Sequence, residues 1–180
     1  MFNIIVLIGE SASGKSTIEK ELVNRGFKKI VSYTTRPIRK NEKDGVDYHY
    51  INKEDFLDKF KNGFFAEHTI YNEWYYGIAT DDCIDDAVVV VEPHGFRQLK
   101  QIDGMNIISF YIQVDERERL VRMVKRGDNL LEVFRRIFSD QGVFQFIENE
   151  VDYVIDNNSN INIDNVVDDI IEIIERVMNG

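Results

Sequence analysis

Residues 4–17 read IIVLIGESASGKST, and this stretch decides the fold. A run of aliphatic residues ends at Gly9, and Gly14, Lys15 and Ser16 follow after four further residues. The spacing GxxxxGK[ST] is that of a phosphate-binding P-loop, in which glycines let successive backbone N–H groups approach phosphate oxygens closely. Lys15 would reach the β- and γ-phosphates, and the Ser16 hydroxyl would bind Mg²⁺. The alternative is a plain Gly/Ser-rich turn between a strand and a helix.

The segments on both sides of this motif fit a strand–loop–helix unit. Residues 2–8 have the composition of a buried parallel strand, and residues 17–24 place Ile18, Leu22 and Val23 on one side of a helix that Gly26 closes. Further strands are predicted at 87–91, 107–114 and 153–155, and further helices at 53–62, 95–101, 117–125, 130–150 and 165–178. Short apolar strands separated by helical segments predict a parallel sheet with helices on both faces. The fold class is therefore α/β, of the three-layer P-loop NTPase type.

The composition limits the kinds of partner. Hydrophobic residues make up 43% of the 180-residue chain, which suits one domain, and the formal net charge is −10. Such a chain would repel nucleic acid and anionic lipid overall. Cys83 is the single cysteine, so an intramolecular disulfide is excluded, and the apolar run at the start is too short to span a membrane. We expect a cytoplasmic protein that binds small anionic ligands, with no nucleic acid, membrane or obligatory protein partner.

Two inserts stand apart from the predicted core, which comprises residues 1–31, 81–116 and 137–180. Residues 32–80 are rich in tyrosine and charge. Residues 117–136 hold seven Lys/Arg against three Asp/Glu, a local net charge of +4. Charge-rich helical stretches are often only solvated faces. Beside a triphosphate site, however, the transition state of phosphoryl transfer carries negative charge that arginines stabilise, so this segment is a candidate lid.

A second basic motif opens the first insert, where residues 32–50 read SYTTRPIRKNEKDGVDYHY. Arg36 and Arg39 are three residues apart, with hydroxyl groups and tyrosines around them. Two guanidinium groups at this spacing can hold one phosphate from two sides. That phosphate would be separate from those in the P-loop, so the chain is predicted to bind two phosphorylated ligands.

At this point the sequence strongly resembles the guanylate kinase family of nucleoside monophosphate kinases. The resemblance covers nearly the whole chain. It rests on the P-loop, SYTTRPIR with Glu42, Asp44-Gly45 and Asp47-Tyr48-His49, then Phe65-Ala66-Glu67, Tyr76-Gly77, Pro93-His94-Gly95, the basic lid and Asp152-Tyr153-Val154. It implies transfer of the γ-phosphoryl group of ATP·Mg²⁺ to GMP, giving GDP and ADP, in a single domain with an NMP-binding insert (32–80) and a lid (117–136).

The resemblance also assigns site residues. It implies that Ser32 and Glu67 read the guanine base, since a carboxylate can accept from N1–H and the exocyclic amine together. Arg36, Arg39, Tyr48 and Tyr76 would clamp the acceptor phosphate. The ATP site would be Gly9, Glu10, Ser11, Ala12, Ser13, Gly14, Lys15, Ser16 and Thr17, with Ser16 as metal ligand. Arg126 and Arg136 would neutralise the transferring group, with Arg135 as a near alternative, and Lys15 and Arg36 complete the catalytic set.

Three positions depart from the family pattern. Ile78 stands where the family usually has Thr or Ser touching the base, and Thr80 is a possible substitute. Val90 and Glu92 stand where the family normally carries two aspartates. Glu92 could bind the base or orient metal-bound water, or be only a carboxylate at a strand end.

These departures leave alternatives open. One is a kinase of the same family that acts on dGMP, another monophosphate or a phosphorylated sugar. Another is a non-catalytic guanylate kinase-like binding module, which would be expected to have a degraded P-loop. The polar loop 156–164 lies where ligands of open α/β sheets bind, although it could equally cap the last helix. The three histidines have no ligand spacing, so no metal site beyond Mg²⁺ is expected.

Overall fold

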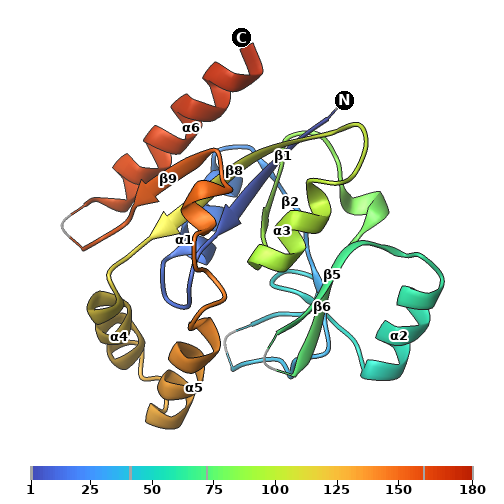
Figure 1. Cartoon of the computed structure of the whole chain (residues 1–180), viewed down its shortest axis with the longest axis horizontal. Helices are drawn as coiled ribbons and strands as arrows, with labels where there is room; N and C mark the ends of the chain where they lie inside the picture. Colours follow the sequence, from blue (N-terminus) through green and yellow to red (C-terminus); the bar gives the residue numbers. More distant parts are fainter. Residues whose placement is uncertain (1, 41, 72, 160, 180) are drawn as a thin grey trace.

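The computed structural model describes residues 2–40, 42–71, 73–159 and 161–179. At its centre lies a five-stranded sheet in the order β2-β7-β1-β8-β9 (Figure 1). Its strands are β1 (Phe2–Ile8), β2 (Lys28–Lys29), β7 (Ala87–Val90), β8 (Met105–Gln113) and β9 (Tyr153–Asp156). Every pairing in this sheet is parallel within the described residues. The predicted α/β class is therefore confirmed.

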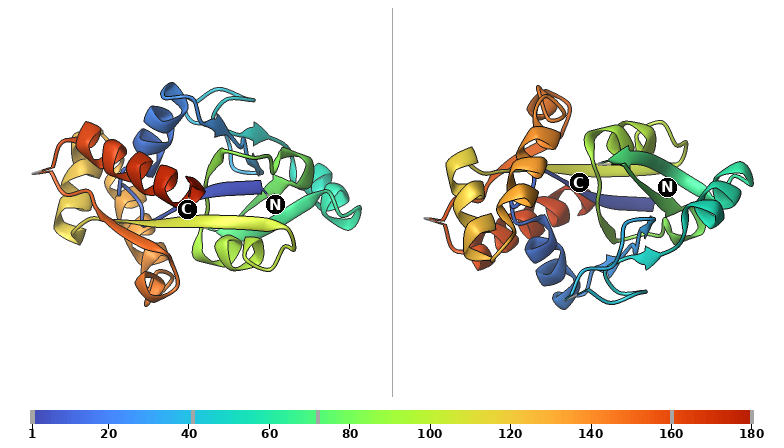
Figure 2. Two further views of the ribbon diagram at one scale, coloured as in Figure 1. Left: turned by 90° about the horizontal axis from the view of Figure 1, so that it is seen from above. Right: turned by 90° about the horizontal axis from the view of Figure 1, so that it is seen from below.

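Helices cover both faces of the parallel sheet, as Figure 2 shows. On one face α1 (Lys15–Asn24) and α6 (Ile163–Asn179) pack against Ile5 and Leu7 of β1. On the other face α3 (Pro93–Leu99) packs against the alternating β1 residues, Ile4 among them. Both sets are fully buried, which explains why β1 is an uninterrupted apolar run.

A second sheet, in the order β4-β3-β6-β5, stands beyond the carboxyl ends of the parallel strands. It comprises β3 (Tyr33–Thr34), β4 (His49–Tyr50), β5 (Phe65–Tyr71) and β6 (Trp74–Ala79), followed by the 3₁₀ turn η1 (Thr80–Asp82). The helix α2 (Lys53–Lys61) closes it, because Phe56 is buried and stacks on Phe65 with ring centroids 4.5 Å apart. Asn41 and Asn72 of the predicted insert, and Asn160 of the loop 156–164, lie outside the described residues.

Two helices face this second sheet across the carboxyl edge of the parallel strands (Figure 1). They are α4 (Glu116–Lys125) and α5 (Leu130–Asp140), which together contain most of the predicted lid. The arrangement brings the P-loop, the second sheet and the basic helices to one edge of the molecule, where α/β proteins bind their ligands.

The predicted helix over 130–150 is wrong in its second half. α5 ends at Asp140, and Gly142 has φ +77°, a left-handed conformation that ends a helix. The chain then turns under the sheet, where Phe144 and Ile147 are buried on the α3 face, and the 3₁₀ turn η2 (Ile147–Asn149) follows. The chain gives up the helix that periodicity favours because this path buries both side chains.

The other predicted strands and helices are confirmed, with ends displaced by one or two residues. α3, for example, begins at Pro93, two residues before the predicted start, because proline fits the first turn of a helix. None of the helices in the described part of the chain combines the length and the apolar character needed to cross a bilayer.

Candidate active site

The loop between β1 and α1 has the shape of an anion cradle. A Cβ atom on Gly9 would lie 2.7 Å from the carbonyl oxygen of Ile112, so only glycine fits there. Gly14 has φ +100°, and a Cβ on it would lie 2.4 Å from Nδ2 of Asn157. Lys15 and Ser16 begin α1, so their N–H groups have no helical acceptor and stand at the positive end of the helix.

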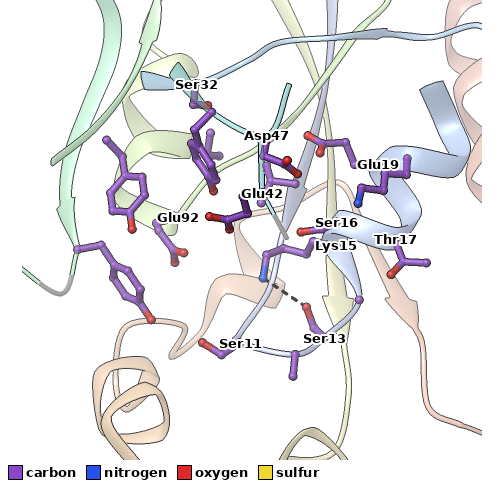
Figure 3. Close-up of a pocket in the computed structure, with 18 of the residues that line it drawn as sticks. Ser11, Ser13, Lys15, Ser16, Thr17, Glu19, Ser32, Glu42, Asp47 and Glu92 are labelled. Carbon is purple, nitrogen blue, oxygen red and sulfur yellow. Dashed lines mark hydrogen bonds between the residues drawn. The ribbon is translucent and has the colours of Figure 1, made fainter. Parts of the chain in front are cut away.

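Lys15 is folded back into the loop. Its Nζ donates to the carbonyl oxygens of Gly9 and Glu10, the latter at 2.8 Å, and Figure 3 shows its longer hydrogen bond to Ser13 Oγ, at 3.4 Å. Burial lowers the pKa of Lys15, while the carboxylates of Glu92, Asp140 and Glu10 act in the opposite direction. The ammonium group is therefore held inside the cradle by backbone oxygens that it can exchange for phosphate oxygens.

The outer side of the P-loop is held by two residues that the sequence did not single out. Arg122 of α4 points Nη1 at the carbonyl oxygens of Ala12 and Ser13, both at 3.4 Å, and Nη2 donates to the carbonyl oxygen of Asn157 at 2.5 Å. Asn157 is buried and donates Nδ2 to Ser13 O at 2.8 Å. Arg122 was one of seven basic residues in the lid, and Asn157 lay in the polar loop after the last strand. Sequence gave no signal that separated them from their neighbours.

The two predicted clamp arginines lie together in the second sheet's entry loop. The Arg36 guanidinium is buried, donates to Glu42 Oε1 at 2.9 Å and lies 5.4 Å from the Tyr48 ring centroid. Arg39 is half-exposed, with Nη1 at 3.7 Å from Glu42 Oε1. The hydroxyl of Tyr50 donates to the same carboxylate at 2.7 Å. Glu42 thus holds both guanidinium groups in place.

Tyrosine hydroxyls complete this cluster. The Tyr48 and Tyr76 rings pack edge to face with centroids 6.0 Å apart. Burial raises the pKa of each phenol, so both remain protonated donors near neutral pH. Two cations and two hydroxyl donors therefore converge on one place, which suits a phosphate monoester.

Two carboxylates, one buried and one partly buried, also line the cavity. Glu67 is only 4% exposed, and a Cβ on Gly95 would lie 2.5 Å from its Oε2. Burial, and then the charge of Glu92, raises the pKa of Glu67 to about 8. Burial raises the pKa of Glu92 to about 7, although Lys15 counteracts it. Oε2 of each has no hydrogen-bond partner among the described residues, so both await a donor.

The positions that depart from the family pattern are placed as follows. Ile78 is directly opposite Glu67 in the β5–β6 pairing, but its side chain is fully buried in the core beneath the cavity. Thr80 is exposed and donates to the carbonyl oxygen of Phe64 at 3.3 Å, so it does not take over the missing contact. Val90 lines the cavity, and so does Thr69, whose role the sequence did not suggest.

Each of the three lid arginines expected at the transferring group is paired with a carboxylate of the lid itself. Nε of Arg126 donates to Asp128 Oδ1 at 2.9 Å. Arg135 and Arg136 both bond to Glu132, at 2.7 Å and 2.8 Å through their Nε atoms. All three guanidinium groups border the cavity, so the choice between Arg135 and Arg136 stays a prediction.

One cavity of about 610 Å³ connects these groups. Figure 3 shows Lys15, Ser16, Ser32 and Glu92 around it. Of the predicted site residues it brings together Ser11, Ala12, Ser13, Gly14, Lys15, Ser16, Thr17, Ser32, Arg36, Arg39, Tyr48, Glu67, Tyr76, Glu92, Arg126 and Arg136. Gly9 and Glu10 lie behind its wall: the Glu10 carboxylate accepts from the Tyr111 hydroxyl at 2.8 Å. The sequence had grouped them with the loop because of the motif alone.

Comparison with known proteins gives a consistent result. The sequence model described as Guanylate kinase matches residues 1–178. A guanylate kinase of Onion yellows phytoplasma (strain OY-M) is 31% identical over 95% of this chain and 84% of the relative. A guanylate kinase of Latilactobacillus sakei is 31% identical over 96% of this chain and 88% of the relative. The crystal structure of guanylate kinase from Anaplasma phagocytophilum has a TM-score of 0.71 at 25% identity, over 97% of this chain and 85% of that one.

These matches extend over the P-loop, the second sheet and the lid alike. They agree with a site that pairs a triphosphate cradle with a second phosphate clamp, and so the chain belongs to the guanylate kinase family.

Proposed function

We propose that this protein transfers the γ-phosphoryl group of ATP to GMP, giving ADP and GDP. The observation that carries the proposal is the single cavity of about 610 Å³ with the P-loop on one side and the Arg36–Arg39–Tyr48–Tyr76 cluster on the other. Family membership supports the same reaction. The net charge of −10 favours small nucleotides over nucleic acid as ligands.

On the ATP side the backbone N–H groups of the loop bind the phosphates, and Lys15 exchanges its carbonyl partners for the β- and γ-phosphate oxygens. The Ser16 hydroxyl, exposed at the start of α1, is placed to hold Mg²⁺. Within the described residues no cluster of three or more His, Cys, Asp or Glu could bind a metal on its own. Kinases usually hold magnesium through one or two protein ligands, and substrate phosphates and water supply the remaining ligands. Mg²⁺ would supply neutralisation of phosphate charge.

On the acceptor side Arg36 and Arg39 grip the phosphate of GMP, and the hydroxyls of Tyr48 and Tyr76 donate to it. Glu67 then lies at the base. Its orphaned Oε2 supports this role, because a buried carboxylate oxygen without a donor costs free energy until a ligand supplies one. Adenine has no matching pair of donors, so the carboxylate favours guanine.

Catalysis follows from position and charge. The acceptor phosphate is already an anionic nucleophile, so no covalent intermediate with the enzyme is required. Arg126 and Arg136 leave Asp128 and Glu132 for the transferring group as α4 and α5 close, and closure excludes the water that would otherwise hydrolyse ATP. An arginine in this role contributes roughly 10³ to 10⁵ in rate.

The direct test is ADP formation from ATP and GMP in a coupled assay. Lys15→Ala and Arg36→Ala should each lower kcat/KM by at least about 10²-fold, as loss of a preorganised donor does. Arg176→Ala, an exposed residue of α6, is the matched control and should retain full activity. Turnover of GMP that is indifferent to either substitution would refute the assignment.

A second candidate is the same transfer to another acceptor. It is favoured by Ile78 and Val90, which place apolar side chains at two positions where the family usually presents polar ones. Loss of polar contacts can change discrimination between bases by orders of magnitude. A panel of GMP, dGMP, IMP, AMP and a sugar phosphate at equal concentration decides between the two: the highest kcat/KM identifies the acceptor.

A further inference from the structure

A buried carboxylate behind the cavity wall takes no part in the reaction described above. Asp140, the last residue of α5, is 5% exposed. Its Oδ2 accepts from the backbone N–H of Ser11 at 2.8 Å and lies 3.3 Å from Nη1 of Arg119. Its Oδ1 accepts from the hydroxyl of Tyr71 and, at 3.3 Å, from that of Ser11. One side chain thus ties together the P-loop, α4, α5 and β5.

Asp140 is paired with a buried arginine. Arg119 of α4 is 7% exposed, and its guanidinium lies between Asp140 and Glu10, 3.9 Å from Glu10 Oε1. Nη1 also reaches the carbonyl oxygen of Ser11 at 3.5 Å. Buried charges that are both paired and hydrogen-bonded fix geometry, because losing one partner leaves the other without compensation. This network therefore holds the first half of the P-loop through both the backbone N–H and the backbone C=O of Ser11.

Tyr71 belongs to the other half of the active site. It is the last residue of β5, the strand that also carries Glu67, and it pairs with Trp74 across the hairpin. Tyr71 and Ser11 both line the active-site cavity, whereas Asp140 borders a separate cavity behind its wall. The Asp140 carboxylate thus connects β5, the strand that bears Glu67, directly to the P-loop.

We propose that Asp140 is a positioning residue that couples the two substrate sites. It contacts the acceptor side through the Tyr71 hydroxyl and the ATP side through the Ser11 N–H. When an acceptor orders β5, Tyr71 fixes Asp140, and Asp140 fixes the loop for the polyphosphate. The coupling rests on the proposed function, since it needs two sites that fill together. It gives the lid helix α5 a role in the P-loop that does not require its arginines.

The test is a binding cycle, which separates coupling from catalysis. The Kd of a non-hydrolysable ATP analogue is measured by calorimetry without and with saturating GMP. For the natural protein we expect GMP to tighten analogue binding at least about fivefold, as allosteric coupling typically does. In Tyr71→Phe this ratio should fall below about two, while each ligand alone binds within about threefold of its original Kd.

Two further variants sharpen the result. Tyr153→Phe removes a hydroxyl from β9, outside the network, and should keep the original ratio. In Asp140→Asn one acceptor oxygen becomes a donor, so the ratio should collapse and KM for ATP should rise about tenfold with a much smaller change in kcat. If Asp140→Asn does not fold, Tyr71→Phe still decides.

An unchanged ratio in Tyr71→Phe, or a ratio of one in the natural protein, would overturn the coupling. Failure of the proposed function gives a different result, namely no ADP from ATP and GMP with the unaltered enzyme. Normal turnover with an unchanged binding ratio would therefore reject the role of Asp140 alone.

Discussion

The substitution Glu67→Gln tests the proposed base-reading role of Glu67 through stability and activity at once. Burial raises the pKa of Glu67 from 4.5 to about 8, so the folded protein binds a proton that the unfolded chain has lost. Stability from this group is complete below about pH 4.5 and is lost as the pH rises towards 8. Glutamine does not titrate, so the variant lacks this loss.

The size of the effect follows from linkage. Between pH 5.5 and pH 8 the free energy of unfolding of the natural protein should fall by about 3 kcal/mol relative to Glu67→Gln. The new amide N–H₂, facing the crowded Gly95, costs about 1–3 kcal/mol at every pH, so the pH-dependent difference is the diagnostic quantity. Urea denaturation at the two pH values measures it. Glu54→Gln, at an exposed position of α2, is the matched control and should show no such difference.

Although Glu67→Gln removes a pH-dependent loss of stability, it should lower activity toward GMP. The amide gives up one charge-assisted hydrogen bond to guanine and turns a donor toward a donor, so kcat/KM for GMP should fall roughly 10²- to 10³-fold. KM for ATP should change less than about threefold. Because guanine needs the ionised carboxylate, GMP binding at pH 7 should also release close to one proton, visible as buffer-dependent calorimetric heat. Equal losses for GMP and ATP, or a stability difference that does not depend on pH, would refute the reasoning.

Three other substitutions probe separate parts of the molecule. Ile78→Thr puts a hydroxyl into the core beneath the cavity and should lower the free energy of unfolding by about 1–3 kcal/mol while kcat/KM for GMP changes less than about twofold; a larger gain would show that the hydroxyl reaches the base. Lys29→Met leaves buried Glu19, whose carboxylate lies 3.1 Å from Lys29 Nζ, without its cation. Burial already raises the pKa of Glu19, so by urea denaturation the variant should lose about 3 kcal/mol of stability at pH 8 and less at pH 5.5, where more of the carboxyl is protonated; equal losses contradict this. Asn157→Ala removes a donor to the P-loop and should raise KM for ATP about tenfold, with KM for GMP as the unaffected reference.

The parts of the site that could be predicted from sequence are those whose residues are local in the chain. The P-loop lies within eight residues, and each fixed position has a chemical reason, so Gly14, Lys15 and Ser16 could be predicted without a structure, which places them together on the cavity wall. The apolar strands were equally clear, because a strand buried on both faces is apolar at every position. Arg36 and Arg39 were predicted as a phosphate clamp from their spacing, whereas Glu67 was predicted only through the family resemblance.

The parts that were missed depend on contacts between distant segments. Asp140 meets Ser11 across 129 positions of the chain, and Asn157 meets Ser13 across 144. A polar residue in a helix or loop gives no sign of such a partner. The wrong prediction of a helix over 130–150 has the same origin. The backbone there follows the burial of Phe144 under the sheet, and sequence periodicity gives no sign of that contact.

The close approach of Asn157 to Gly14 has a consequence for how this loop can change over generations. Glycine is required at position 14 both by its left-handed backbone and by the amide lodged against it, whatever nucleotide the loop holds. A descendant that abandoned phosphoryl transfer would still be under pressure to keep that glycine for folding, whereas Lys15 is held by two carbonyl oxygens and nearby carboxylates rather than by a backbone conformation that excludes other side chains. In this lineage, loss of the lysine should therefore precede loss of the glycine, and under the proposed function only the lysine reports on catalysis.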